Sequence, residues 1–267
     1  MRMVFDKISI DRIDMKETVE RIATGLSGPR NRSLHVVTPN VQFVQLARTN
    51  ARFTEILGKA DLSVADGVPL VWASRLLGNP LPGRVNGTDL MVRLAGESAQ
   101  RGWTVYLLGG CPGAAEKAAA VLCAQYPALR VIGIDCPPMG FMYTPALDAE
   151  VTDRIREAAP DILFVAFGAP KQEIWIDEHR DLPVGVMVSV GGSFELISGM
   201  TRRAPLFFQR AGLEWFWRLM MEPRRLWKRY LVSNTLFLSL LLRMCVQRMF
   251  AFESQPAAAG GTGEGTQ

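Results

Sequence analysis

The chain has 267 residues, of which 48% are hydrophobic, and a formal net charge of +4. This length and composition exclude a disordered or fibrous protein and suit one large α/β domain with an appendage. Four cysteines without CxxC spacing and two distant histidines support neither a disulfide framework nor a zinc site.

The first 20 residues contain no unbroken apolar run, because Asp6, Lys7, Asp11 and Arg12 interrupt it. The sequence therefore shows no secretory signal. We expect the catalytic part of the protein to face the cytosol.

Six short apolar or β-branched runs, each closed by a turn residue or polar group, read as strands. They cover residues 35–40, 61–66, 103–110, 129–135, 161–168 and 185–192. Helical patterns cover residues 40–60, 69–78, 88–102, 113–127, 146–160 and 171–179. Strands that alternate with helices predict an α/β fold with a Rossmann-like, mostly parallel sheet covered by helices on both faces.

Ligands of such sheets bind beyond the carboxyl ends of the strands. The residues predicted at those ends include Thr38, Asn40, Asp66, Gly109, Gly110, Lys171, Gln172 and Gly192. Glycines there let the backbone approach a ligand, and the helix N-termini that follow favour a phosphate. The stretch GGCPG is not the GxGxxG dinucleotide fingerprint, and GxxxxGK[ST] is absent.

Asp66 stands between a predicted strand and a predicted helix, and two interpretations compete. Its carboxylate could cap the helix that begins with VPLVW. Alternatively, it could be a general base at the rim of a cleft, where partial burial tunes its pKa.

Five stretches occur in the order typical of one enzyme family: TPNVQFVQLARTN, ADLSVADGVPLVWASRLLGNPLPGRVNGTDL, VYLLGG, FVAFGAPKQEIWI and SVGGSFELISGMTRRAP. They resemble the motifs of the WecG/TagA/CpsF glycosyltransferases from about Leu34 to Pro223. The resemblance implies transfer of a sugar, often N-acetylmannosamine, from a UDP-sugar to a polyprenyl-diphosphate-linked acceptor with inversion at the anomeric carbon. It also implies no cofactor and no metal, and no DxD pair occurs at a predicted strand end.

The resemblance also assigns roles. Asp66 corresponds to the catalytic base, and Thr38 and Asn40 lie beside the donor sugar, with Thr38 in the catalytic set. Arg84 and Asn86 belong to GRVNGTDL, where Arg84 could meet a diphosphate or pair with Asp89.

Further along the chain, Lys171 would neutralise the leaving diphosphate, and Gln172 would bind a sugar or uridine group. Glu195 of GGSFE corresponds to an acidic residue that resembles a uracil contact. For each of these positions, an ordinary turn, cap or surface role is the alternative.

The C-terminal part holds most of the basic charge. From Thr201 onward there are ten Lys or Arg and four Asp or Glu, a local charge of +6, against 20 and 22 before it. The longest uncharged run, residues 230–242, is shorter than the roughly 20 residues of a membrane span. Three tryptophans among these cations predict a helix lying on an anionic membrane surface, with a core helix or an oligomer contact as the alternative.

We therefore expect a catalytic domain over residues 1–200, a membrane-associating appendage over 201–253 and a disordered tail over 254–267. An arginine of the appendage, Arg224 or Arg229, could complete the active site. The protein would act in bacterial surface or exopolysaccharide synthesis, peripherally on the inner face of the plasma membrane and without nucleic acid. Homo-oligomerisation, the donor sugar and the acceptor glycan stay open. A Rossmann-type oxidoreductase and a non-catalytic membrane-binding module are the competing classes.

Overall fold

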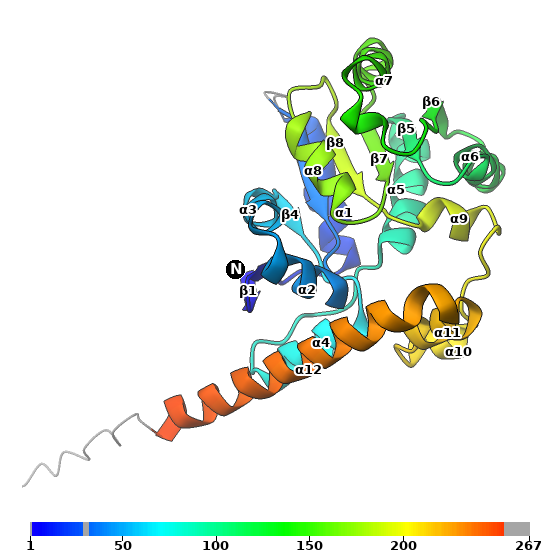
Figure 1. The fold of residues 1–267 in the computed structure, drawn as a ribbon. Helices are drawn as coiled ribbons and strands as arrows, with labels where there is room; N and C mark the ends of the chain where they lie inside the picture. The colour runs from blue at the N-terminus through cyan, green and yellow to red at the C-terminus, as the bar shows by residue number, and fades with distance from the viewer. Residues whose placement is uncertain (1, 29–31, 254–267) are drawn as a thin grey trace, which may run out of the picture.

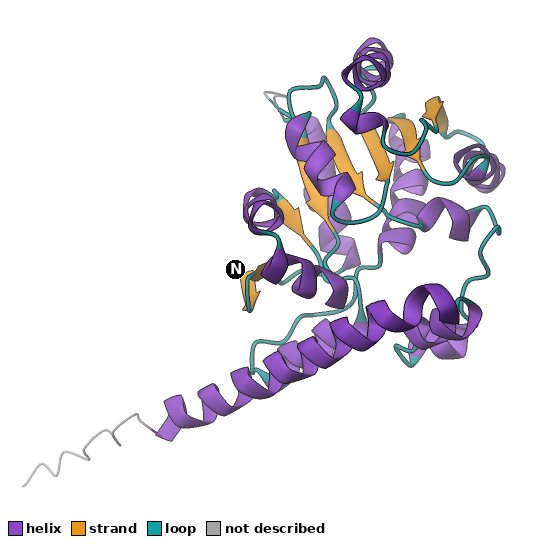
Figure 2. Ribbon diagram, in the orientation of Figure 1, coloured by secondary structure: helices purple, strands orange, loops and turns teal. Residues whose placement is uncertain are grey.

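The computed structural model describes residues 2–28 and 32–253. Its centre is a six-stranded parallel sheet of order β4-β3-β8-β7-β5-β6, with helices on both faces (Figures 1 and 2). The strands are β3 (Leu34–Val37), β4 (Leu62–Ser63), β5 (Thr104–Gly109), β6 (Arg130–Asp135), β7 (Ile162–Ala166) and β8 (Val186–Ser189). The α/β class and all six predicted strands are confirmed.

Helices cover both faces of the sheet, because the strands carry apolar side chains on both faces. The first face packs against α1 (Met15–Ser27), α5 (Gly87–Arg101), α6 (Ala114–Gln125) and α9 (Ser193–Ile197). The second face packs near β5, β7 and β8 against η1 (Phe141–Tyr143), α7 (Pro145–Ala158) and α8 (Lys171–Glu178). In β5, Val105 and Leu107 enter the first layer and Tyr106 and Leu108 the second. Alternation with period two thus builds two apolar layers.

The helix predicted over residues 40–60 is in fact two helices, α2 (Val41–Thr49) and α3 (Ala51–Lys59). Asn50 interrupts the run with extended backbone, and its side chain accepts a hydrogen bond from the N–H of Phe53 at 3.0 Å. An N-cap for the second helix therefore ends the first one, although the apolar periodicity runs through both.

A small antiparallel hairpin, β1 (Arg2–Phe5) and β2 (Ile8–Asp11), lies beside α2 and α3. Its inward side chains, such as Phe5 and Ile10, are fully buried. Together with α2, α3 and α4 (Val68–Leu76), it forms a third apolar cluster. The sequence analysis did not identify this hairpin, because the charged pair Asp6 and Lys7 interrupts its apolar residues.

The predicted basic appendage is helical, with α10 (Leu206–Arg210), α11 (Glu214–Met221) and α12 (Pro223–Glu253). Figure 1 shows α12 running along the α/β part, with α10 and α11 beside its first turns. One side of α12 packs on α2 and the hairpin, where Phe237 stacks on Phe5 with ring centroids 4.9 Å apart. The appendage thus shares an apolar core with the α/β domain that precedes it. The division of the chain into these two domains stays a prediction. The tail over 254–267 lies outside the described residues.

By length and composition, residues Leu226–Arg248 of α12 would be able to cross a membrane. Only 17% of the most apolar 18-residue stretch of this helix is buried. The 13-residue run recognised in the sequence underestimated this stretch, because it stopped at Arg243. The packed face of α12, with Phe237 and Leu240 each 5% exposed, remains part of the protein core.

Candidate active site

A cavity of about 350 Å³ opens at the carboxyl edge of the sheet and is closed on the other side by the appendage. Its sheet side includes seven residues singled out from the sequence: Thr38, Asn40, Asp66, Arg84, Asn86, Gln172 and Gly192. Its appendage side includes Arg202, Arg203, Glu214, Trp215, Arg218, Tyr230, Ser233 and Asn234. Strand ends and a C-terminal helical segment therefore share one cavity.

Asp66 follows β4 and lines this cavity. The N-cap of α4 is Gly67, and α4 has no side-chain capping bond, so the interpretation of Asp66 as a helix cap is wrong. Gly67 has a φ of 139°, which a residue with a Cβ rarely adopts. The turn at Gly67 thereby leaves the carboxylate free to face the cavity.

The Asp66 carboxylate is surrounded by protein, although part of its surface is accessible from the cavity. Burial raises its pKa to about 6, against the opposing effects of Arg84 and of a hydrogen bond from Asn86. That bond runs from Asn86 Nδ2 to Asp66 Oδ1 over 2.8 Å. A carboxyl with this pKa is mostly ionised at neutral pH and is still basic enough to accept a proton.

Asn40 and Asn86 fix the two loops on either side of Asp66. The side chain of Asn40 accepts hydrogen bonds from the first N–H groups of α2, and that of Asn86 caps α5 in the same way. The capping alternative for Asn40 is therefore confirmed, and its amide lines the cavity as well. Thr38, at the end of β3, donates from Oγ1 to the carbonyl of Ser189 at 3.3 Å, which ties β3 to β8.

Arg84 pairs with Glu214 of α11 and lies 3.6 Å from Asp89. Arg203 joins the same network, 2.5 Å from Asp89 and 3.7 Å from Glu214. The predicted pairing of Arg84 with Asp89 is present, although Glu214 is the closer partner. Two arginines and two carboxylates thus connect the appendage to the loop that carries Asn86.

Gln172 is 3% exposed and connects two glycine-bearing loops. Its Oε1 accepts hydrogen bonds from the N–H groups of Gly168 and Gly191, each at 3.1 Å. Its Nε2 donates to Glu173 at 2.7 Å. The loops after β7 and β8 are therefore held together beside the cavity.

Several predicted site residues do not line the cavity. Lys171 is exposed, because the buried face of α8 takes Gln172, Glu173, Trp175 and Ile176 instead. Arg224 is also exposed, and the side chain of Arg229 lies outside the described part of the structure. Their roles in binding stay predictions.

The glycines after β5 are required by packing. A Cβ on Gly109 would come within 2.7 Å of the Phe167 ring, and one on Gly110 within 2.9 Å of Phe194. Neither glycine lines the cavity. Glu195 is likewise outside the lining, and its Oε1 accepts from the N–H of Cys111 at 2.8 Å, which fastens the loop after β5 to α9.

Arg218 of α11 was not singled out from the sequence. It lines the cavity, and its guanidinium would be 3.4 Å from a Cβ on Gly192. Its Nε is buried without a hydrogen-bond partner among the described residues. The only signal was its place among the aromatic residues of EWFWR, which does not reveal the direction of the side chain.

His35 is fully buried in β3, and burial lowers its pKa to about 3. It is therefore a neutral core histidine. Within residues 2–28 and 32–253, no group of three or more His, Cys, Asp or Glu side chains is arranged to hold a metal ion.

Comparison with known proteins places this geometry in context. The glycosyl transferase WecG/TagA/CpsF family matches residues 3–250 of the chain. An N-acetylglucosaminyldiphosphoundecaprenol N-acetyl-beta-D-mannosaminyltransferase of Bacillus spizizenii is 34% identical over 203 residues, 76% of each chain. A Staphylococcus aureus protein of the same name is 34% identical over 223 residues, 82% of this chain and 84% of its own.

Proposed function

Because the chain belongs to the glycosyl transferase WecG/TagA/CpsF family, we propose that it moves a sugar from a UDP-sugar to a polyprenyl-diphosphate-linked saccharide. N-acetylmannosamine is the first candidate, because two relatives are named for its transfer, with a related hexose or uronic acid as the alternative. The protein is a glycosyltransferase, so the oxidoreductase and the non-catalytic module are set aside. The observation that carries the proposal is Asp66, a half-buried carboxylate of raised pKa in a cavity shared by strand ends and the appendage.

The proposed reaction is a single displacement. An acceptor hydroxyl attacks the anomeric carbon from the face opposite UDP, and its proton passes to the Asp66 carboxylate. The new C–O bond forms while the bond between the anomeric carbon and the diphosphate oxygen breaks, and UDP leaves with that electron pair. One carboxylate suffices, since no covalent sugar intermediate forms, and the anomeric configuration inverts.

The two walls of the cavity suit two substrates. We assign the donor to the sheet side, where Thr38, Asn40 and the loops joined by Gln172 lie at strand ends. We assign the acceptor to the appendage side, where Trp215 and Tyr230 pack edge to face with centroids 6.0 Å apart. Asp66 belongs to the sheet side, and Glu214 and Arg218 of the appendage are close enough to influence its pKa, which supports its assignment as the base for the acceptor.

Arginine side chains supply the positive charge for a leaving diphosphate in this proposal. Arg218 is the best placed, since its guanidinium lies against the glycine loop after β8 and faces the same cavity as Asp66. Fixed cations can stabilise charge that develops on a leaving group. We therefore expect activity to survive excess chelator, and a strict need for manganese or magnesium would contradict this part of the proposal.

The appendage also supplies the proposed membrane contact. On α12, Leu231, Leu238 and Leu242 are each more than 60% exposed, and α10 exposes Phe207 at 74%. Exposed apolar side chains beside basic ones favour an anionic membrane interface. Replacing Leu238 and Leu242 by Glu should sharply reduce sedimentation with anionic vesicles and preserve activity on a soluble acceptor. Unchanged sedimentation would contradict the membrane role.

Product analysis tests the whole proposal. Purified protein would be incubated with a panel of UDP-sugars and a short-chain lipid-diphosphate N-acetylglucosamine, and products would be identified by mass spectrometry and NMR. We expect one donor to give a disaccharide of inverted configuration. A retained configuration would rule out the single displacement, and the absence of transfer from every UDP-sugar would rule out the donor class.

A further inference from the structure

Glu173 follows Gln172 on α8, is 0% exposed and has no role in the reaction described above. Its Oε1 accepts the hydrogen bond from Gln172 Nε2 at 2.7 Å. Its Oε2 has no hydrogen-bond partner in the described part of the chain, although the Ser189 hydroxyl is close enough to affect it. Burial raises the pKa of Glu173 to about 7, against the opposing effects of Gln172 and Ser189.

A buried carboxyl at this position needs an explanation. The neighbouring buried positions of α8 carry Trp175 and Ile176, so an apolar residue would suit packing alone. Burying a carboxyl that is only partly hydrogen-bonded is unfavourable. The 2.7 Å hydrogen bond from the amide of Gln172 to this carboxyl indicates its role.

The bonding capacity of the Gln172 amide is almost fully used. Its oxygen has two lone pairs, and both are taken by the N–H groups of Gly168 and Gly191. One of its two N–H bonds points to Glu173, so one remains on a residue that lines the cavity. The opposite orientation of the amide would face its NH₂ towards two N–H donors, so only one orientation satisfies all partners.

We propose that Glu173 is a positioning residue that holds the Gln172 amide in the orientation that joins the two glycine loops and presents one N–H to an oxygen of the bound nucleotide sugar. The inference rests on the proposed function, since it names the ligand of the same cavity. Without an acceptor at residue 173, an N–H of Gln172 would be buried unpaired. The amide would then turn towards water, and the loops of Gly168 and Gly191 would lose their common anchor.

The test compares two variants of the full-length protein. Glu173→Met keeps the length of the side chain and removes the acceptor, whereas Glu173→Gln keeps a carbonyl acceptor. For Glu173→Met we expect UDP affinity, measured by calorimetry, to fall about tenfold and KM for the UDP-sugar to rise similarly. Glu173→Gln should recover most of this loss. Wild-type affinity and KM in Glu173→Met would overturn the proposal, as would an equal loss in Glu173→Gln.

A double-mutant cycle separates positioning from a direct role. If Glu173 acts only through Gln172, adding Glu173→Met to Gln172→Leu should cause no further loss of UDP affinity. Losses that multiply would overturn the proposal. If wild-type protein neither binds UDP nor transfers sugar, the proposed function itself fails, and this inference with it. That result is distinct from one in which only the variants disagree.

Should Glu173→Met fail to fold, wild-type protein still provides a test by NMR. The Nε2 proton of Gln172 that bonds to Glu173 should exchange with solvent much more slowly than the other proton on the same nitrogen. Equal exchange rates would overturn the proposal.

Discussion

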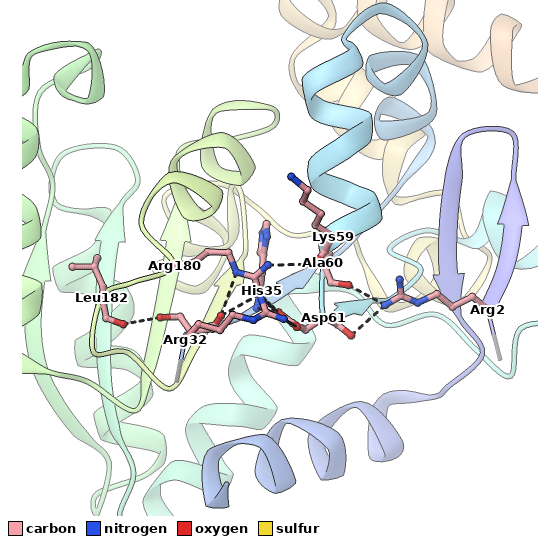
Figure 3. Close-up of polar contacts among 9 residues, drawn as sticks. Arg2, Arg32, His35, Lys59, Ala60, Asp61, Arg180 and Leu182 are labelled. Atoms are coloured by element: carbon pink, nitrogen blue, oxygen red, sulfur yellow. Dashed lines mark hydrogen bonds and ion pairs between the residues drawn. The ribbon is translucent and has the colours of Figure 1, made fainter. Parts of the chain in front are cut away.

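The two ends of the parallel sheet use their polar groups differently. At the amino end, Asp61 receives hydrogen bonds from the N–H of His35 at 2.9 Å, from Arg32 at 2.6 Å and from Arg180. Figure 3 shows the wider network, in which Arg180 also donates to the carbonyls of Ser33 and Lys59. The charged groups at this end are paired with one another, although both ring nitrogens of the buried His35 lack a partner among the described residues.

At the carboxyl end, the polar groups retain unused bonding capacity. Glu173 and Glu195 each have a buried oxygen without a partner among the described residues, and so does Nε of Arg218. Asp66 has one side-chain partner and a raised pKa. The difference lies in the charged groups: at the amino end they pair with one another, which favours stability, and at the carboxyl end they keep bonding capacity that a ligand could use.

The largest effect should come from Asp66→Asn. Turnover should fall by roughly 10²- to 10⁴-fold, because the amide cannot accept the acceptor proton. UDP affinity and fold should be retained, because Asn is isosteric with Asp and can still pair with Asn86. Single-turnover kinetics with calorimetry would check this. Near-normal turnover would show that Asp66 is not the base, and the carboxyl end would then lose its main catalytic group.

The second prediction concerns how the free energy of unfolding depends on pH. The pKa of Glu173 is about 7 in the folded protein and about 4.5 when unfolded, so the folded state binds the proton more tightly. The wild-type free energy of unfolding should therefore fall as pH rises from about 4.5 to 7, by about 3 kcal/mol in total from this group.

Urea unfolding of wild-type and Glu173→Gln across this pH range measures the effect. The variant should lack that part of the decline, and parallel curves for the two proteins would contradict the raised pKa. Asp66 contributes a decline of the same sign in both proteins, since its pKa is also raised by burial.

At the amino end of the sheet, we expect a substitution to lower stability and to leave turnover unchanged. Asp61→Ala leaves Arg32 and Arg180 without their carboxylate, so we expect a loss of about 2 kcal/mol in unfolding free energy, discounted because Asp61 is partly exposed. Turnover at low temperature should stay near wild type. Glu55→Ala, which removes an exposed pair with Lys59 at the same end, is the matched control and should leave stability unchanged. A catalytic defect in Asp61→Ala would blur the division between the two ends.

Much of the fold could be predicted, because each of the six strands is a short apolar run closed by a turn residue. The two-residue β4 was recognised because it lies in the run LSVA, which is apolar except for Ser63 and whose four residues are all buried. Asn50 was missed as a break, since a single cap residue does not interrupt apolar periodicity. The hairpin over residues 2–11 was missed because Asp6 and Lys7 at its turn interrupt the apolar pattern.

The candidate site was also predicted only in part from the sequence. Asp66 and Gln172 come together because strand ends of one sheet must meet at one edge, and Asn86, the N-cap of α5, joins them through its bond to Asp66. Gly109 does not line the cavity, and its φ and packing require glycine there, so its substrate contact stays a prediction. The cavity wall from α11 was not foreseen, since helical phase and docking of an appendage depend on contacts distant in sequence.

The last prediction asks which arginine the appendage brings to the site. Arg218→Ala should lower kcat/KM about tenfold on a water-soluble acceptor, where membrane attachment does not matter, because a fixed cation near the diphosphate is lost. Arg224→Ala tests the sequence-based candidate, whose side chain is exposed and outside the cavity lining. Arg243→Ala, an exposed cation farther along α12, controls for a general loss of positive charge.

A loss confined to Arg218→Ala would place the appendage in the chemistry of the carboxyl end through α11. A loss confined to Arg224→Ala would mean that the appendage rearranges when substrate binds, because Arg224 does not reach the cavity in the present arrangement. Equal losses in all three variants would mean that the appendage contributes only its net positive charge. Arg218 would then have no specific contact with the ligand.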